Sequence, residues 1–164
     1  MSRVSTLTPP PAPRGGLPDE VPPVVLAAMS LWLFAVAAGA FEALLMVTVE
    51  LSSGTAFGEL LPQIVFRLAV FGAAVFLALR LRHRRNWARL TLAVGLGIFG
   101  TLSLVVEPAR WLLAGGSIGD AVAAAAPMDL VFAGSRILHL LAVLGAVTLM
   151  FQPRANAFFL GRSA

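Results

Sequence analysis

Apolar residues occupy four long stretches of this chain, at residues 24–49, 61–79, 87–106 and 130–151. A helix of about 20 mostly apolar residues crosses a hydrocarbon core about 30 Å thick. Since all four stretches have about that length, the pattern predicts an all-α polytopic membrane protein. Short connections between consecutive spans favour antiparallel neighbours, so we expect a compact four-helix transmembrane bundle.

Prolines and one asparagine mark the expected helix ends. They are Pro22-Pro23 before the first span, Pro62 in the opening turn of the second, Asn86 before the third, and Pro108 and Pro153 just past the third and fourth. The connection at 108–128 is expected to cap the bundle, with Trp111-Leu112-Leu113 at the lipid interface and a short helix near residues 121–126. A re-entrant segment is the alternative for this connection.

Three regions follow from the same pattern. Residues 1–22 are proline-rich and are predicted to be a disordered cytoplasmic tail, residues 23–152 hold the four spans, and residues 153–164 are predicted to be a short cytoplasmic tail. A cleaved signal peptide is the alternative for the beginning of the chain, because Ala38-Gly39-Ala40 resembles a cleavage site.

Composition narrows the class of protein further. Of the 164 residues, 59% are hydrophobic and only 12% are charged, against about 25% charged in soluble domains. The chain contains no cysteine. These values exclude a soluble enzyme, a nucleic-acid binder and a disulfide-linked secreted domain, and they make the lipid bilayer the first expected partner.

The positive charges indicate the orientation, because arginine-rich short loops stay in the cytoplasm. Arginines cluster between the second and third spans, at Arg80, Arg82, Arg84, Arg85 and Arg89, and they also occur near both chain ends, at Arg3, Arg14, Arg154 and Arg162. The two opposite connections hold only Arg110. We therefore expect a bacterial plasma (inner) membrane protein with both termini in the cytoplasm, and contact between the arginine cluster and anionic lipids.

Several charged or titratable residues fall at or near membrane depth, where each needs a partner, water or a route to the headgroups. They are Glu42, Arg67, Arg136 and His139, with Glu107 and Asp129 at the outer edge of the same layer. One hypothesis is an intramembrane polar network in which Glu42 pairs with Arg67 or Arg136 and fixes helix contacts. Another is an outward-facing pocket for an anion, a lipid headgroup or a partner, and a third is proton coupling through His139.

Residue spacing predicts which helix faces meet. Asp129, Phe132, Arg136, His139 and Val143 form one stripe on the fourth span, which is expected to face inward. Small residues that let helices approach closely occur at Ala35, Ala38 and Gly39, and again at Ala93, Gly97 and Thr101.

A search for catalytic and metal-binding patterns is negative. No cysteine, tyrosine or lysine is present, and the two histidines are separated by a span and lie on different sides of the bilayer, which excludes a histidine-based metal centre within one chain. The string Gly95-Leu96-Gly97-Ile98-Phe99-Gly100 matches GxGxxG but lies inside a span, outside the strand-to-helix context of nucleotide-binding loops. We therefore expect no enzyme activity, no cofactor and no metal.

Two short motifs give the chain a resemblance to a known group. They are Arg84-Arg85-Asn86-Trp87-Ala88-Arg89 and Pro153-Arg154-Ala155-Asn156-Ala157-Phe158-Phe159. In these motifs and in its composition the chain resembles uncharacterised small actinobacterial multi-pass membrane proteins with four spans. The resemblance implies an inner-membrane location and an accessory role, and it supplies no catalytic residues.

Two functions remain for a chain of this kind. The leading hypothesis is a non-enzymatic accessory or scaffold subunit whose partners are other membrane proteins or further copies of itself. The alternative is a small carrier or channel component that uses Arg67, Arg136 and His139 in the path of an anion or a proton.

Overall fold

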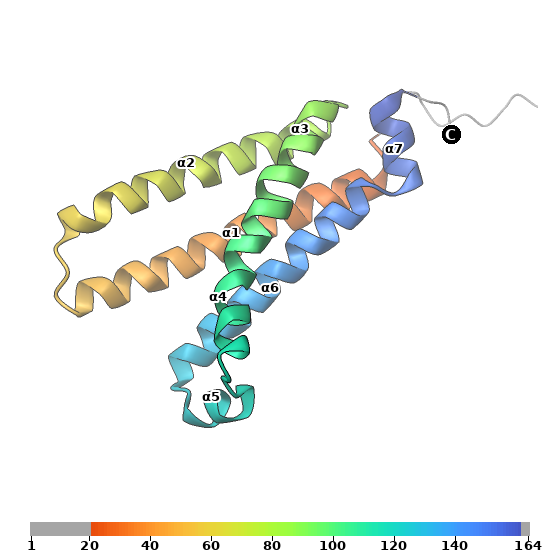
Figure 1. Ribbon diagram of the computed structural model, residues 1–164. Helices are drawn as coiled ribbons and strands as arrows, with labels where there is room; N and C mark the ends of the chain where they lie inside the picture. Colours follow the sequence, from red (N-terminus) through yellow and green to blue (C-terminus); the bar gives the residue numbers. More distant parts are fainter. Residues whose placement is uncertain (1–20, 162–164) are drawn as a thin grey trace, which may run out of the picture.

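Four long apolar helices, each of sufficient length to cross a membrane, make up most of the chain (Figure 1). The computed structural model describes residues 21–161. The long helices are α1 (Pro23–Ser52), α2 (Phe57–Leu81), the continuous helix formed by α3 (Asn86–Thr91), η1 (Leu92–Gly100) and α4 (Thr101–Leu113), and α6 (Pro127–Met150). No strand occurs among the described residues. The prediction of an all-α fold with four membrane-crossing helices is confirmed.

The bundle has two ends with different chemistry. At the end that we call the arginine-rich end, α1 begins, α2 turns into α3 through residues 82–85, and α6 is followed by α7 (Pro153–Leu160). At the opposite end, α1 turns into α2, and α4 connects to α6 through the short helix α5 (Ile118–Ala124). Consecutive long helices are therefore antiparallel, as their short connections require.

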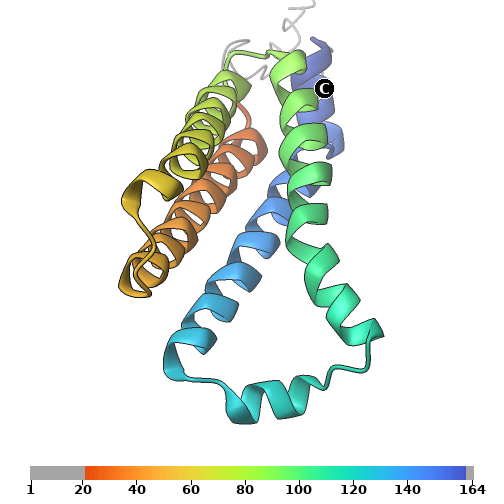
Figure 2. The ribbon, with the colours of Figure 1, turned by 60° about the vertical axis from the view of Figure 1, so that its left-hand side comes forward.

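Close packing is confined to the arginine-rich half of the bundle. The buried apolar cluster contains Val25, Ala28, Trp32, Ala35, Ala78, Leu81, Leu92, Ala93, Ala142, Val143, Ala146, Met150, Ala155, Phe158 and Phe159. Many of these side chains are alanines, which let α1 and α6 approach closely. Toward the opposite end the α1–α2 hairpin and the α4–α6 hairpin diverge, and α4 also leans away from α6 (Figures 1 and 2). The four-helix bundle is thus compact at one end and open at the other.

Two helix boundaries differ from those predicted at prolines. The second long helix begins at Phe57, so Pro62 lies inside α2 rather than in its opening turn, and the third continues to Leu113, so Pro108 lies inside α4 rather than past its end. Proline removes one backbone donor from a helix interior. Inside a membrane protein, the carbonyl that is released can take a side-chain donor instead.

Residues 153–160 form α7 rather than part of a tail. Pro153 occupies the first turn, Gly161 ends the helix with a φ of 66°, and Ala155, Phe158 and Phe159 are buried against the bundle. The apolar face of α7 therefore closes the arginine-rich end of the core. The predicted tail at residues 1–20 and residues 162–164 lie outside the described residues.

The connection at the opposite end contains the short helix α5, where the sequence predicted a short helix near residues 121–126. Ser117 caps α5 by accepting a hydrogen bond from the backbone N–H of Asp120 at 3.3 Å. A Cβ atom added to Gly116 would clash with the Trp111 ring, so this glycine is required for the ring to cover the turn. At seven residues, α5 is too short to cross a bilayer.

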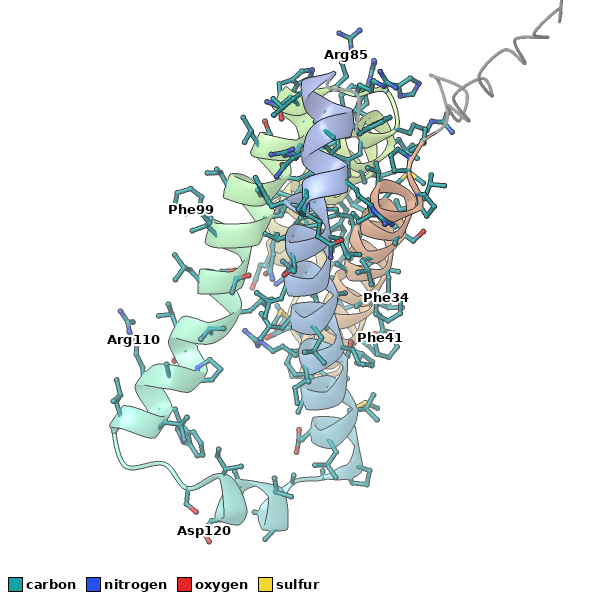
Figure 3. The ribbon with its side chains drawn as sticks, turned by 90° about the vertical axis from the view of Figure 1, so that its right-hand side faces the viewer. Phe34, Phe41, Arg85, Phe99, Arg110 and Asp120 are labelled. Carbon is teal, nitrogen blue, oxygen red and sulfur yellow. The ribbon has the colours of Figure 1, made fainter. Side chains whose placement is uncertain are left out.

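Large apolar side chains cover the outer surface of the long helices. Phe34, Phe41 and Phe99 point away from the bundle (Figure 3), and their exposed fractions are 50%, 44% and 65%. Such a surface would aggregate in water but is the expected surface of helices in lipid. The chain is a multi-pass membrane protein.

Candidate intramembrane polar site

Glu42 and His139 meet where the two hairpins begin to diverge. Glu42 on α1 is only 7% exposed, and its Oε1 lies 3.3 Å from Nδ1 of His139 on α6. At that distance a protonated Nδ1 donates to the carboxylate. The partner of Glu42 is therefore His139, whereas the sequence predicted Arg67 or Arg136. The pair joins the two helices that pack most closely.

Gly39 makes this contact possible. It lies one turn before Glu42, and a Cβ atom at Gly39 would be 3.0 Å from Cε1 of His139 and 3.3 Å from Cε1 of Phe71. The His139 ring therefore lies against the backbone of α1. The predicted role of the small residues Ala35, Ala38 and Gly39 as a close-approach face is consistent with this geometry, since Ala35 and Gly39 are buried.

A bulky residue at Gly39 should displace the histidine ring. Gly39→Leu is expected to destabilise the protein by about 1–3 kcal/mol, because the extra atoms have no space between α1 and α6. Gly72→Leu is the matched control, since nothing lies within 4 Å of a Cβ atom at Gly72. Unfolding in mixed detergent micelles measures both effects, and equal stability of the two variants would contradict the close approach.

Arg67 contributes to the same region from α2. It is half-buried, and its Nη2 lies 3.4 Å from the sulfur of Met46. A thioether is a weak acceptor. Among the described residues no carboxylate lies within ion-pair distance of Arg67, so its charge is not compensated there.

These side chains border a small, partly open cavity of about 150 Å³, which we call the polar cavity after Glu42, Arg67 and His139, although the rest of its lining is apolar. Its walls are Gly39, Glu42, Phe66, Arg67, Val70, Phe71, Leu104 and His139. A second cavity of about 150 Å³ lies against the other side of His139 and extends into the core, lined mostly by apolar residues such as Trp32 and Val143. His139 thus lines two cavities, and Glu42 and Arg67 lie on the walls of only one of them.

Arg136 lies one turn from His139 on α6 but does not reach this cavity. Its Nη2 donates to the backbone carbonyl of Leu104 at 3.2 Å, and its Nε is buried without a partner among the described residues. Leu104 is four residues before Pro108, which has no N–H to offer that carbonyl. Pro108 therefore supplies the acceptor that holds Arg136 at membrane depth.

A double-mutant cycle tests this relation between proline and arginine. Arg136→Leu should destabilise the protein by about 0.6–2 kcal/mol, because it leaves the Leu104 carbonyl without a donor in the bilayer. In a Pro108→Ala background the backbone N–H of residue 108 can serve that carbonyl, so the same substitution should cost less. Additive effects in detergent unfolding measurements would show that the two residues do not share the acceptor.

A groove between α4 and α6 lies beyond Arg136, toward the opposite end. It has a volume of about 360 Å³, and its lining residues are Leu104, Val105, Pro108, Ala109, Leu112, Ala133, Arg136, Ile137 and Leu140. Arg136 is the charged member of this otherwise apolar lining. We call this surface the α4–α6 groove.

The remaining two predicted network residues lie apart from the cavity. Asp129 is exposed and accepts a hydrogen bond from the backbone N–H of Ala126 at 2.9 Å, which caps α6, and Glu107 is exposed on α4. The structure thus brings together Glu42, Arg67 and His139, places Arg136 beside them, and leaves Glu107 and Asp129 outside the cavity. Within residues 21–161, no three histidine or acidic side chains converge as metal ligands.

The arginine cluster divides into two groups. Arg82, Arg84 and Arg85 are exposed and Arg80 is half-buried, in keeping with contact to the headgroups. Arg89 is different, because it is only 7% exposed and its guanidinium carbon lies 4.4 Å from the ring centre of Phe151 and 5.1 Å from that of Phe159. Arg89 is therefore a contact between α3 and α7 rather than a lipid-facing charge. The sequence signal for this contact was the group of phenylalanines after the fourth span.

Comparison with protein-family models finds no match, and comparisons with curated proteins and with solved structures find none either.

Proposed function

We propose that this multi-pass membrane protein is a non-enzymatic accessory or scaffold subunit of the plasma membrane. In this proposal, the α4–α6 groove receives a transmembrane helix of a partner protein. The observation that supports it is the uneven packing: the core fills the arginine-rich half, while α4 leans away from α6 in the other half (Figure 2).

The charge of Arg136 indicates what the partner helix carries. Its guanidinium has a backbone carbonyl as its acceptor, its Nε has no partner, and no carboxylate forms an ion pair with it among the described residues. A lone positive charge at membrane depth is costly, and an acid on a neighbouring helix offsets that cost. We therefore propose a partner helix with an aspartate or glutamate at the depth of Arg136.

Photo-crosslinking in native membranes tests this proposal. A photoreactive residue at Ile137 or Val105, both in the groove, should give a crosslink to a membrane segment of another protein that contains an acidic residue. The crosslink should be retained with Arg136→Lys and lost with Arg136→Leu. Val65, an exposed residue that lines neither the groove nor the polar cavity, is the matched control site.

Other crosslinking results would contradict the proposal. They are crosslinks only to lipid, crosslinks to a second copy of this chain, an acid-free partner segment, and equal yields at Ile137 and Val65.

A small carrier or channel component is the second candidate, and the Glu42–His139 pair favours it. The pair combines two titratable groups, lies beside Arg67 on the wall of a cavity, and occupies the open half of the bundle. Such groups at membrane depth are typical of ion and proton paths.

Water access distinguishes the two candidates. Ser103 lines the cavity on the other side of His139, and Ser103→Cys adds a thiol of nearly the same size to a chain without cysteine. Labelling by a membrane-impermeant maleimide from the opposite end, at a rate comparable with a control at the exposed Gly119, Gly119→Cys, would favour the carrier. An unreactive thiol would favour the accessory subunit.

A further inference from the structure

A basic pocket lies at the arginine-rich end, outside the polar site described above. Its volume is about 330 Å³, and it is lined by Arg80, Arg82, His83, Arg84, Arg85 and Phe158. The first five residues come from the end of α2 and the turn to α3, and the last comes from α7. We call this the basic pocket.

Backbone geometry gathers the arginines of the turn on one concave surface. The backbone N–H of His83 donates to the carbonyl of Arg80 at 3.1 Å, and that of Arg84 donates to the carbonyl of Leu81 at 3.3 Å. Arg84 has a φ of 55°, a left-handed conformation that is uncommon for a residue other than glycine. The chain keeps an arginine at a position where glycine would fold with less strain, which favours a role for that side chain.

Aromatic rings fix the walls of the basic pocket. The guanidinium carbon of Arg84 lies 4.8 Å from the ring centre of Phe158, and that of Arg80 lies 4.7 Å from that of Phe76. A guanidinium that stacks on a ring keeps its N–H donors in its own plane, the geometry in which arginine binds an anion edge-on. Phe158 in turn is held by α7, whose buried Phe159 packs edge to face against it at 5.4 Å.

The charge around the pocket is positive. Among the residues that the structure describes, four arginines and a histidine line it, and no acidic side chain does. Within residues 21–161, the acidic side chains are all in the other half of the bundle or at the opposite end: Glu42, Glu50, Glu59, Glu107, Asp120 and Asp129. A strong anion is therefore the ligand that complements the pocket.

The position of the basic pocket along the membrane normal indicates which molecule supplies that anion. The pocket lies immediately past the ends of the helices that cross the membrane, and Trp87, 51% exposed at the start of the third long helix, has the position of an interfacial anchor. This is the level of the phosphates of the lipid headgroups. Arginine forks bind phosphate in a bidentate manner, and several arginines can hold more than one phosphate.

We propose that the basic pocket is a binding site for an anionic phospholipid whose headgroup carries two phosphates. The arginines of the turn bind the phosphates, and Phe158 on α7 forms the apolar wall against the glycerol region. A site of this kind is distinct from the general attraction of basic loops to anionic membranes, because it has a defined shape and depends on α7. It does not depend on the function proposed for the α4–α6 groove.

Lipid binding by the purified full chain tests the site. The chain is reconstituted in zwitterionic nanodiscs, and a diphosphate lipid or a monophosphate lipid is added at matched total charge. We expect the diphosphate lipid to raise the melting temperature and to be retained in native mass spectrometry at least tenfold better than the monophosphate lipid. Inorganic pyrophosphate should have no such effect, since the proposed ligand is a lipid.

Two variants distinguish binding in the basic pocket from the general attraction between arginines and anionic lipids. The triple variant R82Q/R84Q/R85Q should lose the preference for the diphosphate lipid, whereas Arg110→Gln, which removes an exposed arginine at the opposite end, should keep it. Phe158→Leu keeps every charge and should reduce the preference several-fold. Equal retention of both lipids by the unmodified chain, an unchanged preference in the triple variant, or equal stabilisation by pyrophosphate would overturn the proposal.

Discussion

Trp32→Ala is expected to lower the free energy of unfolding by about 3–5 kcal/mol, the largest effect of any single substitution proposed for this chain. Trp32 is 1% exposed and is among the largest fully buried side chains. Its indole Nε1–H donates to the sulfur of Met150 at 3.4 Å, which joins α1 to the end of α6. Removing the ring would leave a cavity between the two helices that hold the core together.

Trp87→Ala is the matched control for that substitution. Trp87 is 51% exposed, so the same change in side chain removes little packing within the bundle. Unfolding by a denaturing detergent in mixed micelles measures the two variants side by side. If Trp32→Ala and Trp87→Ala were equally stable, the arginine-rich half would not be the packed core described here.

Glu42→Leu is expected to lower the free energy of unfolding by about 1–3 kcal/mol, as much as Gly39→Leu, because it leaves the His139 ring without its acceptor at membrane depth. Within residues 21–161, Glu42 and His139 are the one carboxylate and basic side chain that lie within 4 Å of each other. Loss of this pair would loosen α1 from α6 where the hairpins diverge. From the sequence, Glu42 was predicted to pair with an arginine, which this substitution would leave without its partner. In the structure the partner of Glu42 is His139 instead.

A double-mutant cycle isolates the Glu42–His139 interaction. Glu42→Gln, His139→Gln and the double variant are compared by detergent unfolding, and an interaction energy above about 0.5 kcal/mol is expected. Arg67→Gln serves as the comparison, because Arg67 contacts Met46 rather than Glu42. Additivity for Glu42 with His139 together with coupling for Glu42 with Arg67 would support the originally predicted pair instead.

The apolar pattern was sufficient to predict the long helices, because each is set by local composition. It placed the first span at 24–49 and the last at 130–151, within a few residues of α1 and α6. The pattern ended the third span at residue 106, too early, because Pro108 was treated as a stop signal whereas α4 continues to Leu113. In a membrane helix the missing hydrogen bond can be supplied from elsewhere, here by Arg136.

It was harder to predict which side chains of the polar site contact one another than to predict which side chains belong to it. Depth along the helices put Glu42, Arg67 and His139 in one layer, and the three do line one cavity. Contacts among these three side chains depend on how each helix is rotated about its axis and on how far the hairpins diverge. Residue spacing along one helix contains no information about either. Opposite formal charge favoured an arginine as the predicted partner of Glu42. In the structure, the close approach of the His139 ring to Gly39 places the histidine beside Glu42 instead.

The basic pocket was visible in the sequence only as a run of arginines. Its shape depends on α7, a segment that the sequence suggested was a tail. Arg89, which belonged to the same run, proved to be a buried contact to Phe151 and Phe159. Neighbouring residues of one charge cluster thus have different surroundings, according to whether they lie in the turn before α3 or on the face of α3 that meets α7.

Topology mapping with single cysteines tests the central claim most directly, since the native chain has none. Cysteines introduced after Arg85 and at Gly119, where a side chain has room, are exposed to a membrane-impermeant reagent in intact cells and in inverted vesicles. The proposed orientation predicts labelling at Gly119 only from outside and labelling after Arg85 only from the cytoplasmic side. Labelling of both positions from the same side would contradict a helix from Asn86 to Leu113 that crosses the membrane.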